Sequence, residues 1–380
     1  MCDDQAESIK EIRQMVAHFA RTEIGPHARE WDEKAHFPRD VIRRLGELGL
    51  MGILIPEKDG GSGLTYRHYV AVLEELGAVE GGIGLSVAAH NSLCTQHIYT
   101  YGTEATKRAW VARLAKGEVV GAWGLTEPEA GSDAGATRTT AVREGDGWVI
   151  NGSKNFITHA GAGGVAVIVA RTRPGTDAHG ISAFVVPLDA PGVSVGKHED
   201  KVGMRVSDTA PLALEDVRVA ADALCGREGD GFIQAMEILD GGRISIAALA
   251  VGIARGALDA ATAYAKQRRQ FNRPIAAFQA VRFKLADMAT AVDAARLLTE
   301  RAAEMKDEGA KTTLISAQAK LLASETAVHV AEEAVQIHGG YGYLKDFPVE
   351  KFWRDAKLCT IGEGTSEIQR LVIAREVLGD

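Results

Sequence analysis

Glu363 lies between two glycines near the end of the chain, in the run Gly362-Glu363-Gly364. Glycine adopts backbone angles that other residues avoid, and it lets a ligand approach the main chain closely. A carboxylate held in such a turn can enter a pocket as a general base, with backbone N–H groups beside it to bind an oxygen. The same run is equally compatible with a flexible turn before the last helix, with Thr365 or Ser366 as the N-cap.

A second candidate site is the segment from Gly124 to Gly135, which is dense in Gly, Ser, Thr and Asp. Small residues, hydroxyls and free backbone N–H groups suit close approach to a flat polar ligand such as a flavin ring. The alternative is an ordinary loop, because these residue types are also turn formers. The length and density of the segment favour binding.

Two further segments could contact phosphate groups. The glycines after His338 could end a helix, or they could lie against a dinucleotide. The run from Arg268 to Pro274 holds three arginines, whose side chains suit bidentate phosphate contacts. Taken alone, this run is better interpreted as a solvated basic turn. His338 has no second His or Cys at metal-ligand spacing, so we expect no metal site.

Composition favours a soluble globular enzyme of more than one packed unit. The 380 residues are 46% apolar and 25% charged, and the net charge of −8 argues against a nucleic-acid surface. Cys2, Cys94, Cys225 and Cys359 lack metal or redox spacing, so we expect four reduced thiols. The N-terminus reads as neither a secretory nor a mitochondrial presequence, and no run of about 18 apolar residues occurs. We therefore expect a cytoplasmic protein without a membrane span.

The elements that must position these candidates fall into three zones. Residues 5–118 have helical spacing, which the glycine run 81–84 is expected to interrupt. Residues 120–228 are predicted to form a β domain, because strand patterns at 139–142 and 148–150 flank a turn at 144–147.

Residues 229 onward are helical again. Phe278, Val281, Leu285, Met288 and Val292 step by three and four residues, as in a helix bundle. Neither a G-x-G-x-x-G fingerprint nor a Walker A loop is present, and the P-loop-like run 192–197 is interpreted as a strand edge.

With these motifs taken together, the chain resembles the acyl-CoA dehydrogenase family along nearly its whole length, with the short-chain (butyryl) type most similar. The matching motifs are, in order, the first signature at 124–136, the middle-domain motif at 201–209, the segment 285–288, the second signature at 336–355 with Lys351 and Asp355, and the final run 363–370.

The resemblance implies a multidomain α+β fold. It would have an N-terminal helical domain at 1–119, a central β-barrel or β-sandwich domain at 120–228, and a C-terminal four-helix bundle at 229–380. The family usually assembles as a homotetramer built from dimers. Non-covalent FAD would lie between the β domain of one subunit and the bundle of a neighbour.

The resemblance also assigns binding residues. Those expected to line the isoalloxazine are Trp123, Leu125, Thr126, Gly131, Ser132, Phe156, Ile157 and Thr158. Those expected to reach the FAD pyrophosphate and adenosine, from the adjacent subunit, are Arg268, Phe271, Gln279, Gln336, Ile337, Gly339 and Gly340, with Thr365, Ser366 and Glu367 near the adenine and pyrophosphate. Those expected to contact acyl-CoA are Ser132, Asp240, Gly241, Gly242, Arg243 and Gly364.

The implied reaction is α,β-dehydrogenation of an acyl-CoA. Glu363 would take the α-proton while the β-hydrogen leaves as hydride to flavin N5, which gives a trans-2-enoyl-CoA. The Glu363 N–H and a flavin ribityl hydroxyl would stabilise the enolate, and exclusion of water would raise the pKa of the base. Electrons would pass to an electron-transferring flavoprotein, as in fatty acid β-oxidation.

Departures from the family pattern concern the base and the acyl pocket. Some members place the base one residue before the arginine that matches Arg243, but that position here is Gly242, which has no side chain to act as a base. Gly362 stands where the straight-chain enzymes have a bulky aromatic residue, which loosens one wall of the acyl pocket and leaves the length and branching of the acyl group open. The resemblance as a whole implies a short- to medium-chain acyl-CoA, straight or branched. Phe156 replaces a common Trp, and Glu129 a common Gly. Two alternatives remain: an oxidase that uses oxygen, and a non-catalytic binding or assembly protein.

Overall fold

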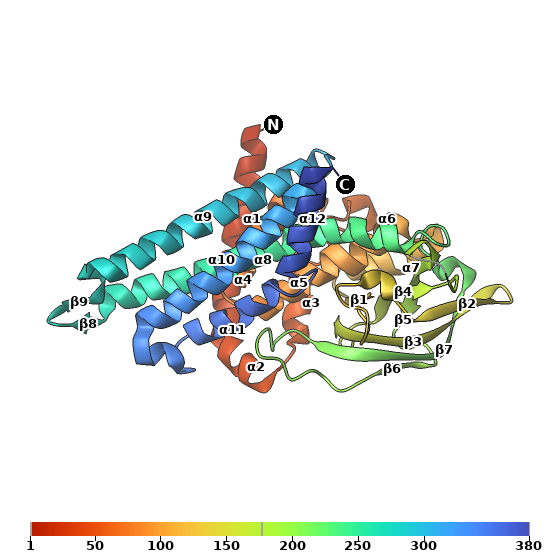
Figure 1. Ribbon diagram of the computed structural model, residues 1–380, viewed down its shortest axis with the longest axis horizontal. Coiled ribbons are helices and arrows are strands. Elements are labelled where there is room, and N and C mark those ends of the chain that lie inside the picture. Colours follow the sequence, from red (N-terminus) through yellow and green to blue (C-terminus); the bar gives the residue numbers. More distant parts are fainter. Residues whose placement is uncertain (1, 176–177, 380) are drawn as a thin grey trace.

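The structure is a computed structural model that describes residues 2–175 and 178–379. A layer of long helices runs the length of the molecule, and the β-sheet lies at one end of it (Figure 1). The opposite end carries the short hairpin of β8 (Arg269–Gln270) and β9 (Arg273–Pro274). The sheet and the hairpin are therefore far apart in the folded chain.

Seven α-helices lie in the described part of the N-terminal zone. They are α1 (Cys2–Phe19), α2 (Ala28–Lys34), α3 (Arg39–Glu47), α4 (Tyr66–Gly77), α5 (Gly81–Ala89), α6 (Gln96–Tyr101) and α7 (Glu104–Ala115). Helix α4 is buried on almost all sides and packs against both α1 and the central helix of the bundle. The N-terminal zone and the bundle thus share one apolar core.

The glycine run 81–84 does not interrupt a helix, so that prediction is wrong. The break lies just before the run, and the glycines form the first turn of α5, where the Glu80 carboxylate accepts a hydrogen bond from the Gly82 N–H at 3.0 Å. A Cβ at Gly84 would lie 2.5 Å from Leu249 Cδ1. Close helix packing therefore requires glycine here and overrides its weak helix propensity.

The described residues of the central zone form one curled sheet of seven strands. They are β1 (Gly121–Gly124), β2 (Thr140–Glu144), β3 (Gly147–Thr158), β4 (Val165–Arg171), β5 (Ile181–Pro187), β6 (Val193–Val195) and β7 (Thr209–Ala220). The order is β1-β4-β2-β3-β7-β6, with β5 on the free side of β4. The predicted β2–β3 hairpin is present, and Gly145 has φ +61° in its turn. The run 192–197 contains the edge strand β6, as expected.

Both faces of β4 are buried, which explains its unbroken apolar sequence. Val165, Val167 and Val169 pack in the cluster that includes α6, α7 and the start of α8. The alternate residues Ala166, Ile168 and Ala170 pack in a second cluster with Trp148 and Phe184. The sheet is therefore covered by helices on one face and by its own curled strands on the other.

The C-terminal zone contains α8 (Gly231–Gln267), α9 (Gln279–Asp307), α10 (Thr313–His338), α11 (Val349–Cys359) and α12 (Ser366–Leu378). The predicted apolar stripe lies on α9, where Met288 and Val292 are fully buried. Helix α8 is long and apolar enough to cross a membrane by length and composition, but 78% of its most apolar window is buried inside the protein. The α+β fold expected from the sequence is confirmed.

Candidate active site

Glu363 occupies a turn between α11 and α12, with its backbone in the left-handed region. Its φ is +54°, and Gly364 follows with φ +92°. A left-handed conformation is unfavourable for a residue other than glycine and is often found where function requires it. Thr365 caps α12, because its Oγ1 accepts a hydrogen bond from the Ile368 N–H at 3.3 Å. The turn therefore serves as a helix start and also orients a carboxylate.

Two buried side chains hold the carbonyls of this turn. Gln369 Nε2 donates to the Glu363 carbonyl at 3.2 Å and to the Gly364 carbonyl at 3.0 Å. Lys320 Nζ donates to the same Gly364 carbonyl at 2.6 Å. In the described chain, no backbone carbonyl accepts from the Glu363 N–H. That N–H is available to a ligand oxygen.

The Glu363 carboxyl group lies directly against Gly242 of α8. A Cβ at Gly242 would be 2.0 Å from Glu363 Oε2 and 3.2 Å from Leu93 Cδ2. Oε2 itself is buried, and within residues 2–175 and 178–379 it has no hydrogen-bond partner. Burial raises the pKa of the Glu363 carboxyl from 4.5 to about 7. The positive charges of Lys320 and Arg243 act in the other direction and lower this pKa by less than burial raises it. A carboxyl group with this pKa can take up a proton near neutral pH.

The segment 240–243 lies beside this carboxyl and carries its own charge pair. Arg243 Nη1 donates to Asp240 Oδ1 at 2.5 Å, and Asp240 Oδ2 accepts from Thr313 Oγ1 at 2.7 Å. Arg243 Nε is buried without a partner among the described residues, as are Ser366 Oγ and Gln369 Oε1. Unpaired buried polar atoms are uncommon. Their concentration around Glu363 indicates the binding of a polar ligand.

The residues expected to line the isoalloxazine come together at one edge of the sheet. The loop after β1 and the end of β3 are joined by the Asn155 N–H, which donates to the Thr126 carbonyl at 2.9 Å. Phe156 has φ +59° and is 65% exposed, although it is aromatic. A Cβ at Gly131 would meet no other atom within 4 Å. This edge presents open backbone and an uncovered ring, which suits a flat ligand.

Sequence reasoning missed the ion pair that supports this loop. Lys154 and Glu127 are buried and lie 2.6 Å apart. Glu127 also accepts from the N–H groups of Arg138 and Thr139, and Lys154 donates to the Leu125 carbonyl. The sequence offered one indication of this pair: Lys154 continues a strand pattern, and Glu127 is an acidic residue of the segment from Gly124 to Gly135.

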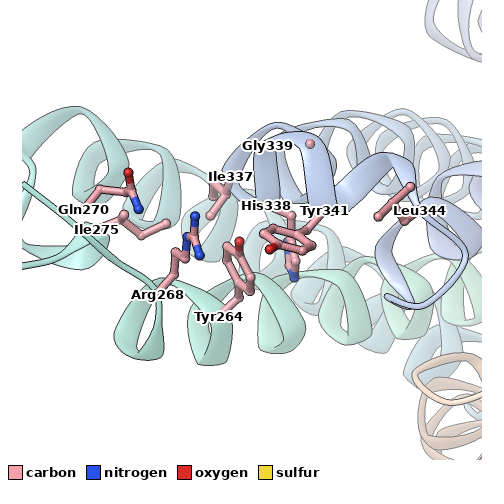
Figure 2. Close-up of a pocket in the computed structure, with 10 residues that line it drawn as sticks. Tyr264, Arg268, Gln270, Ile275, Ile337, His338, Gly339, Tyr341 and Leu344 are labelled. Carbon is pink, nitrogen blue, oxygen red and sulfur yellow. The ribbon is translucent and has the colours of Figure 1, made fainter.

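The residues between 268 and 340 that are expected at the FAD pyrophosphate and adenosine lie at the far end of α8 and α10. Thr365, Ser366 and Glu367, expected near the same groups, lie instead at the start of α12 beside Glu363. At the far end of α8 and α10, a groove of about 430 Å³ is lined by Arg268, Ile337, Gly339 and Gly340 of the expected set (Figure 2). The Arg268 guanidinium lies 5.3 Å from the Tyr341 ring centre. Phe271, Gln279 and Gln336 are exposed at the same end. Arginine beside open glycine backbone fits a phosphate group.

The two groups of expected flavin residues are too far apart to meet within one chain. Arg243 lies near the start of α8 and Arg268 follows its last residue, and 25 residues at a rise of 1.5 Å correspond to about 37 Å. Figure 1 likewise shows β1 near one end of α8 and the β8–β9 hairpin at the other.

His338 is a packing residue. Its ring stacks on Tyr264 with centres 4.1 Å apart, and its Nδ1 bonds the Ala334 carbonyl at 2.8 Å. Across the described ranges, no group of three or more His, Cys, Asp or Glu side chains is arranged to hold a metal ion. Cys359 packs in the apolar core.

Three family models match successive parts of the chain. They describe the N-terminal domain of acyl-CoA dehydrogenase at residues 6–118, the middle domain at 122–217 and the C-terminal domain at 229–378. The short-chain specific acyl-CoA dehydrogenase of Clostridium acetobutylicum is 47% identical over 366 residues, which cover 96% of this chain and 97% of the relative.

Solved structures of similar proteins have the same fold over nearly the whole chain. Butyryl-CoA dehydrogenase from Megasphaera elsdenii has a TM-score of 0.96 at 41% identity and covers 97% of this chain and 98% of its own. A chain from a structure described as the electron transferring flavoprotein of Acidaminococcus fermentans has a TM-score of 0.97 at 46% identity, with 98% of both chains covered.

Proposed function

The chain belongs to the acyl-CoA dehydrogenase family of FAD-dependent oxidoreductases, and we propose that it dehydrogenates a short- to medium-chain acyl-CoA to its trans-2-enoyl-CoA. The observation that carries this proposal is the Glu363 carboxyl group. It is held in a left-handed turn, has no partner for Oε2 in the described chain, and has a pKa raised by burial to about 7.

Glu363 takes the α-proton of the thioester. A hydrogen α to a thioester is weakly acidic, so a buried carboxylate with a raised pKa is a better match than one in water. The Glu363 N–H binds the thioester oxygen and stabilises the developing enolate. Arg243, fixed by Asp240, and the Gly364 backbone orient the acyl-CoA.

The chain's own residues fit FAD at two places. Trp123, Phe156 and the loop around Ser132 would hold the ring system non-covalently, and bound FAD supplies the acceptor for the β-hydrogen as hydride. Arg268, Gly339 and Gly340 would hold the phosphate groups. Because these places lie at opposite ends of α8, each FAD would require the far end of a second copy, which supports a homodimer and a tetramer of two dimers.

The acyl group is proposed to be short to medium, straight or branched. A Cβ on Gly362 would have ordinary contacts, the nearest 3.7 Å from the Leu358 carbonyl oxygen, so this position leaves room that a larger side chain would occupy. The short-chain specificity of the Clostridium acetobutylicum relative and the butyryl substrate named for the Megasphaera elsdenii enzyme support the same range.

The electron acceptor is proposed to be an electron-transferring flavoprotein. The similarity to a chain solved in that context supports it. The same proposal includes a role in fatty acid β-oxidation, which the proposed reaction supports. It also includes a cytoplasmic location, which the bacterial origin of the relatives named above supports.

Anaerobic bleaching of the flavin by a panel of acyl-CoAs tests the reaction and the substrate together. Butyryl-CoA should bleach the holoenzyme rapidly, and Glu363→Gln should keep FAD but not bleach. If no straight, branched or cyclic acyl-CoA bleaches the wild type, the proposal is wrong. Rapid reoxidation by air would instead identify an oxidase.

A further inference from the structure

Lys320 of α10 is a fully buried lysine whose ammonium group lies next to the Glu363 turn. Buried lysines are rare unless they are paired with an acidic group. Lys154, also fully buried, pairs with Glu127 at 2.6 Å, and Lys351 pairs with Asp355 and with Glu80. Lys320 differs from both, because among the described residues it forms no ion pair, and its ammonium donates to the Gly364 carbonyl at 2.6 Å.

The carbonyl that Lys320 contacts belongs to the turn that carries Glu363. Gln369 Nε2 donates to the same oxygen at 3.0 Å. The Gly364 carbonyl therefore has two donors, one charged and one neutral. This arrangement holds a left-handed residue in place, and it directs the Glu363 carboxyl toward Gly242.

Several charged or titratable groups face this site from the surrounding helices. They are Arg243 and Asp240 on α8, Lys320 on α10, Cys359 at the end of α11, Glu367 and Arg375 on α12, and Tyr66 and Tyr69 on α4. The Arg243 charge is offset by Asp240 at 2.5 Å. Lys320 thus supplies the buried positive charge near Glu363 that no acidic side chain of the described residues neutralises by direct contact.

We propose that Lys320 is a positioning residue for the base: its ammonium fixes the Glu363–Gly364 turn through the Gly364 carbonyl, and its positive charge favours the ionised form of the Glu363 carboxyl. This inference rests on the proposed function, in which Glu363 must be a carboxylate before it takes the α-proton. Lys320 transfers no proton itself. It acts through its charge and one hydrogen bond, and it offsets part of the desolvation that burial imposes on Glu363.

Three variants separate the charge from the hydrogen bond. Lys320→Met removes both, Lys320→Gln keeps a polar group toward the Gly364 carbonyl but has no charge, and Gln369→Leu removes the neutral donors to the same turn. The readout is the acid limb of the kcat/KM–pH profile of the holoenzyme. Loss of the charge should move this limb upward by about 1 pH unit or more in both Lys320 variants. Gln369→Leu should lower the rate without moving it.

A second readout does not depend on turnover. The protonated Glu363 carboxyl should titrate in an infrared difference spectrum of the ligand-free holoenzyme, and it is assigned by its absence in Glu363→Gln. The titration should move upward in Lys320→Met, or in Lys320→Gln if the first variant does not fold. An unchanged titration in a folded variant overturns the proposal. Normal turnover by Glu363→Gln would instead overturn the proposed function, while the titration would still decide whether Lys320 acts on Glu363.

Discussion

Two regions of this protein bury a glutamate near a fully buried lysine, with opposite results. Under the loop after β1, Lys154 touches Glu127 at 2.6 Å. Burial alone would raise the pKa of Glu127, but the Lys154 charge and hydrogen bonds from Lys154, Arg138 and Thr139 lower it. In the turn before α12, the Lys320 ammonium contacts a carbonyl instead, and burial raises the pKa of Glu363 to about 7.

This difference shows that a buried lysine and a buried glutamate can form either a structural ion pair or the surroundings of a reactive base. In the first region the Glu127 carboxylate has three hydrogen-bond donors and stays ionised. In the second region Oε2 of Glu363 has no partner among the described residues. The lysine is close enough to influence the charge and too far for direct pairing. The unsatisfied carboxyl is the reactive one.

Exchange of the reactive carboxyl should have the largest effect on activity. Glu363→Gln keeps the shape of the side chain but cannot take a proton, so turnover should fall by about 10²–10⁴-fold or more. Steady-state assays with butyryl-CoA measure this, and the flavin absorbance per subunit shows whether FAD is retained. Near-normal turnover would place the base elsewhere.

Breaking the structural pair should mainly affect stability. Lys154→Met leaves the Glu127 carboxylate buried without a countercharge, which should cost about 3–5 kcal/mol in the free energy of unfolding. Urea denaturation measures the loss. The matched control is Lys154→Met combined with Glu127→Gln, which removes the buried charge and should recover part of it. A stable single variant would show that this pair is not the support of the loop.

A methyl group at Gly242 should misplace the base. Its Cβ would lie 2.0 Å from Glu363 Oε2, so the carboxyl group must move. Displacement of a reacting group by about 1 Å can cost 10²-fold in rate, and Gly242→Ala should therefore reduce kcat by about 10- to 10²-fold. Kinetics with a thermal unfolding control measure the effect. An unchanged kcat would mean that the carboxyl works from another position.

The two glutamates should also respond oppositely to pH, and this is the smallest effect. Glu363 binds its proton more tightly in the folded state, so the stability it contributes is present at low pH and is lost as the pH rises from 4.5 to about 7. Glu127 has a lowered pKa when folded, so its contribution is present above the unfolded pKa of 4.5 and is lost in acid.

Stability measured from pH 3 to pH 8 tests this contrast. Glu363→Gln should gain stability relative to wild type as the pH rises from 4.5 to about 7, whereas Glu127→Gln should lose stability relative to wild type as the pH rises to 4.5. Parallel curves for the two variants would remove the distinction between the regions.

Much of this arrangement could be predicted from local sequence. The β2–β3 hairpin follows from Gly145 and Gly147 between strand patterns, and Glu363 is distinguished by its flanking glycines together with the family motifs. The apolar stripe of α9 could also be predicted from the spacing of its residues alone.

The remaining features depend on contacts between distant residues. Lys320 sits in an ordinary helical pattern, and only the packing of the Glu363 turn on α10 buries it. The prediction that the run 81–84 interrupts a helix is wrong, because the close packing of Val206 on Gly82 and of Leu249 on Gly84 outweighs the local tendency of glycine to end a helix. The Lys154–Glu127 pair likewise joins a strand and a loop 27 residues apart.

The central claim is that Glu363 removes the α-proton, and a kinetic isotope effect tests it most directly. Butyryl-CoA carrying deuterium at both α-positions should bleach the wild-type flavin more slowly than the unlabelled substrate under anaerobic single-turnover conditions. Glu363→Gln with full FAD should not be bleached by either substrate. Bleaching of that variant at the wild-type rate, with the same isotope effect, would contradict the account.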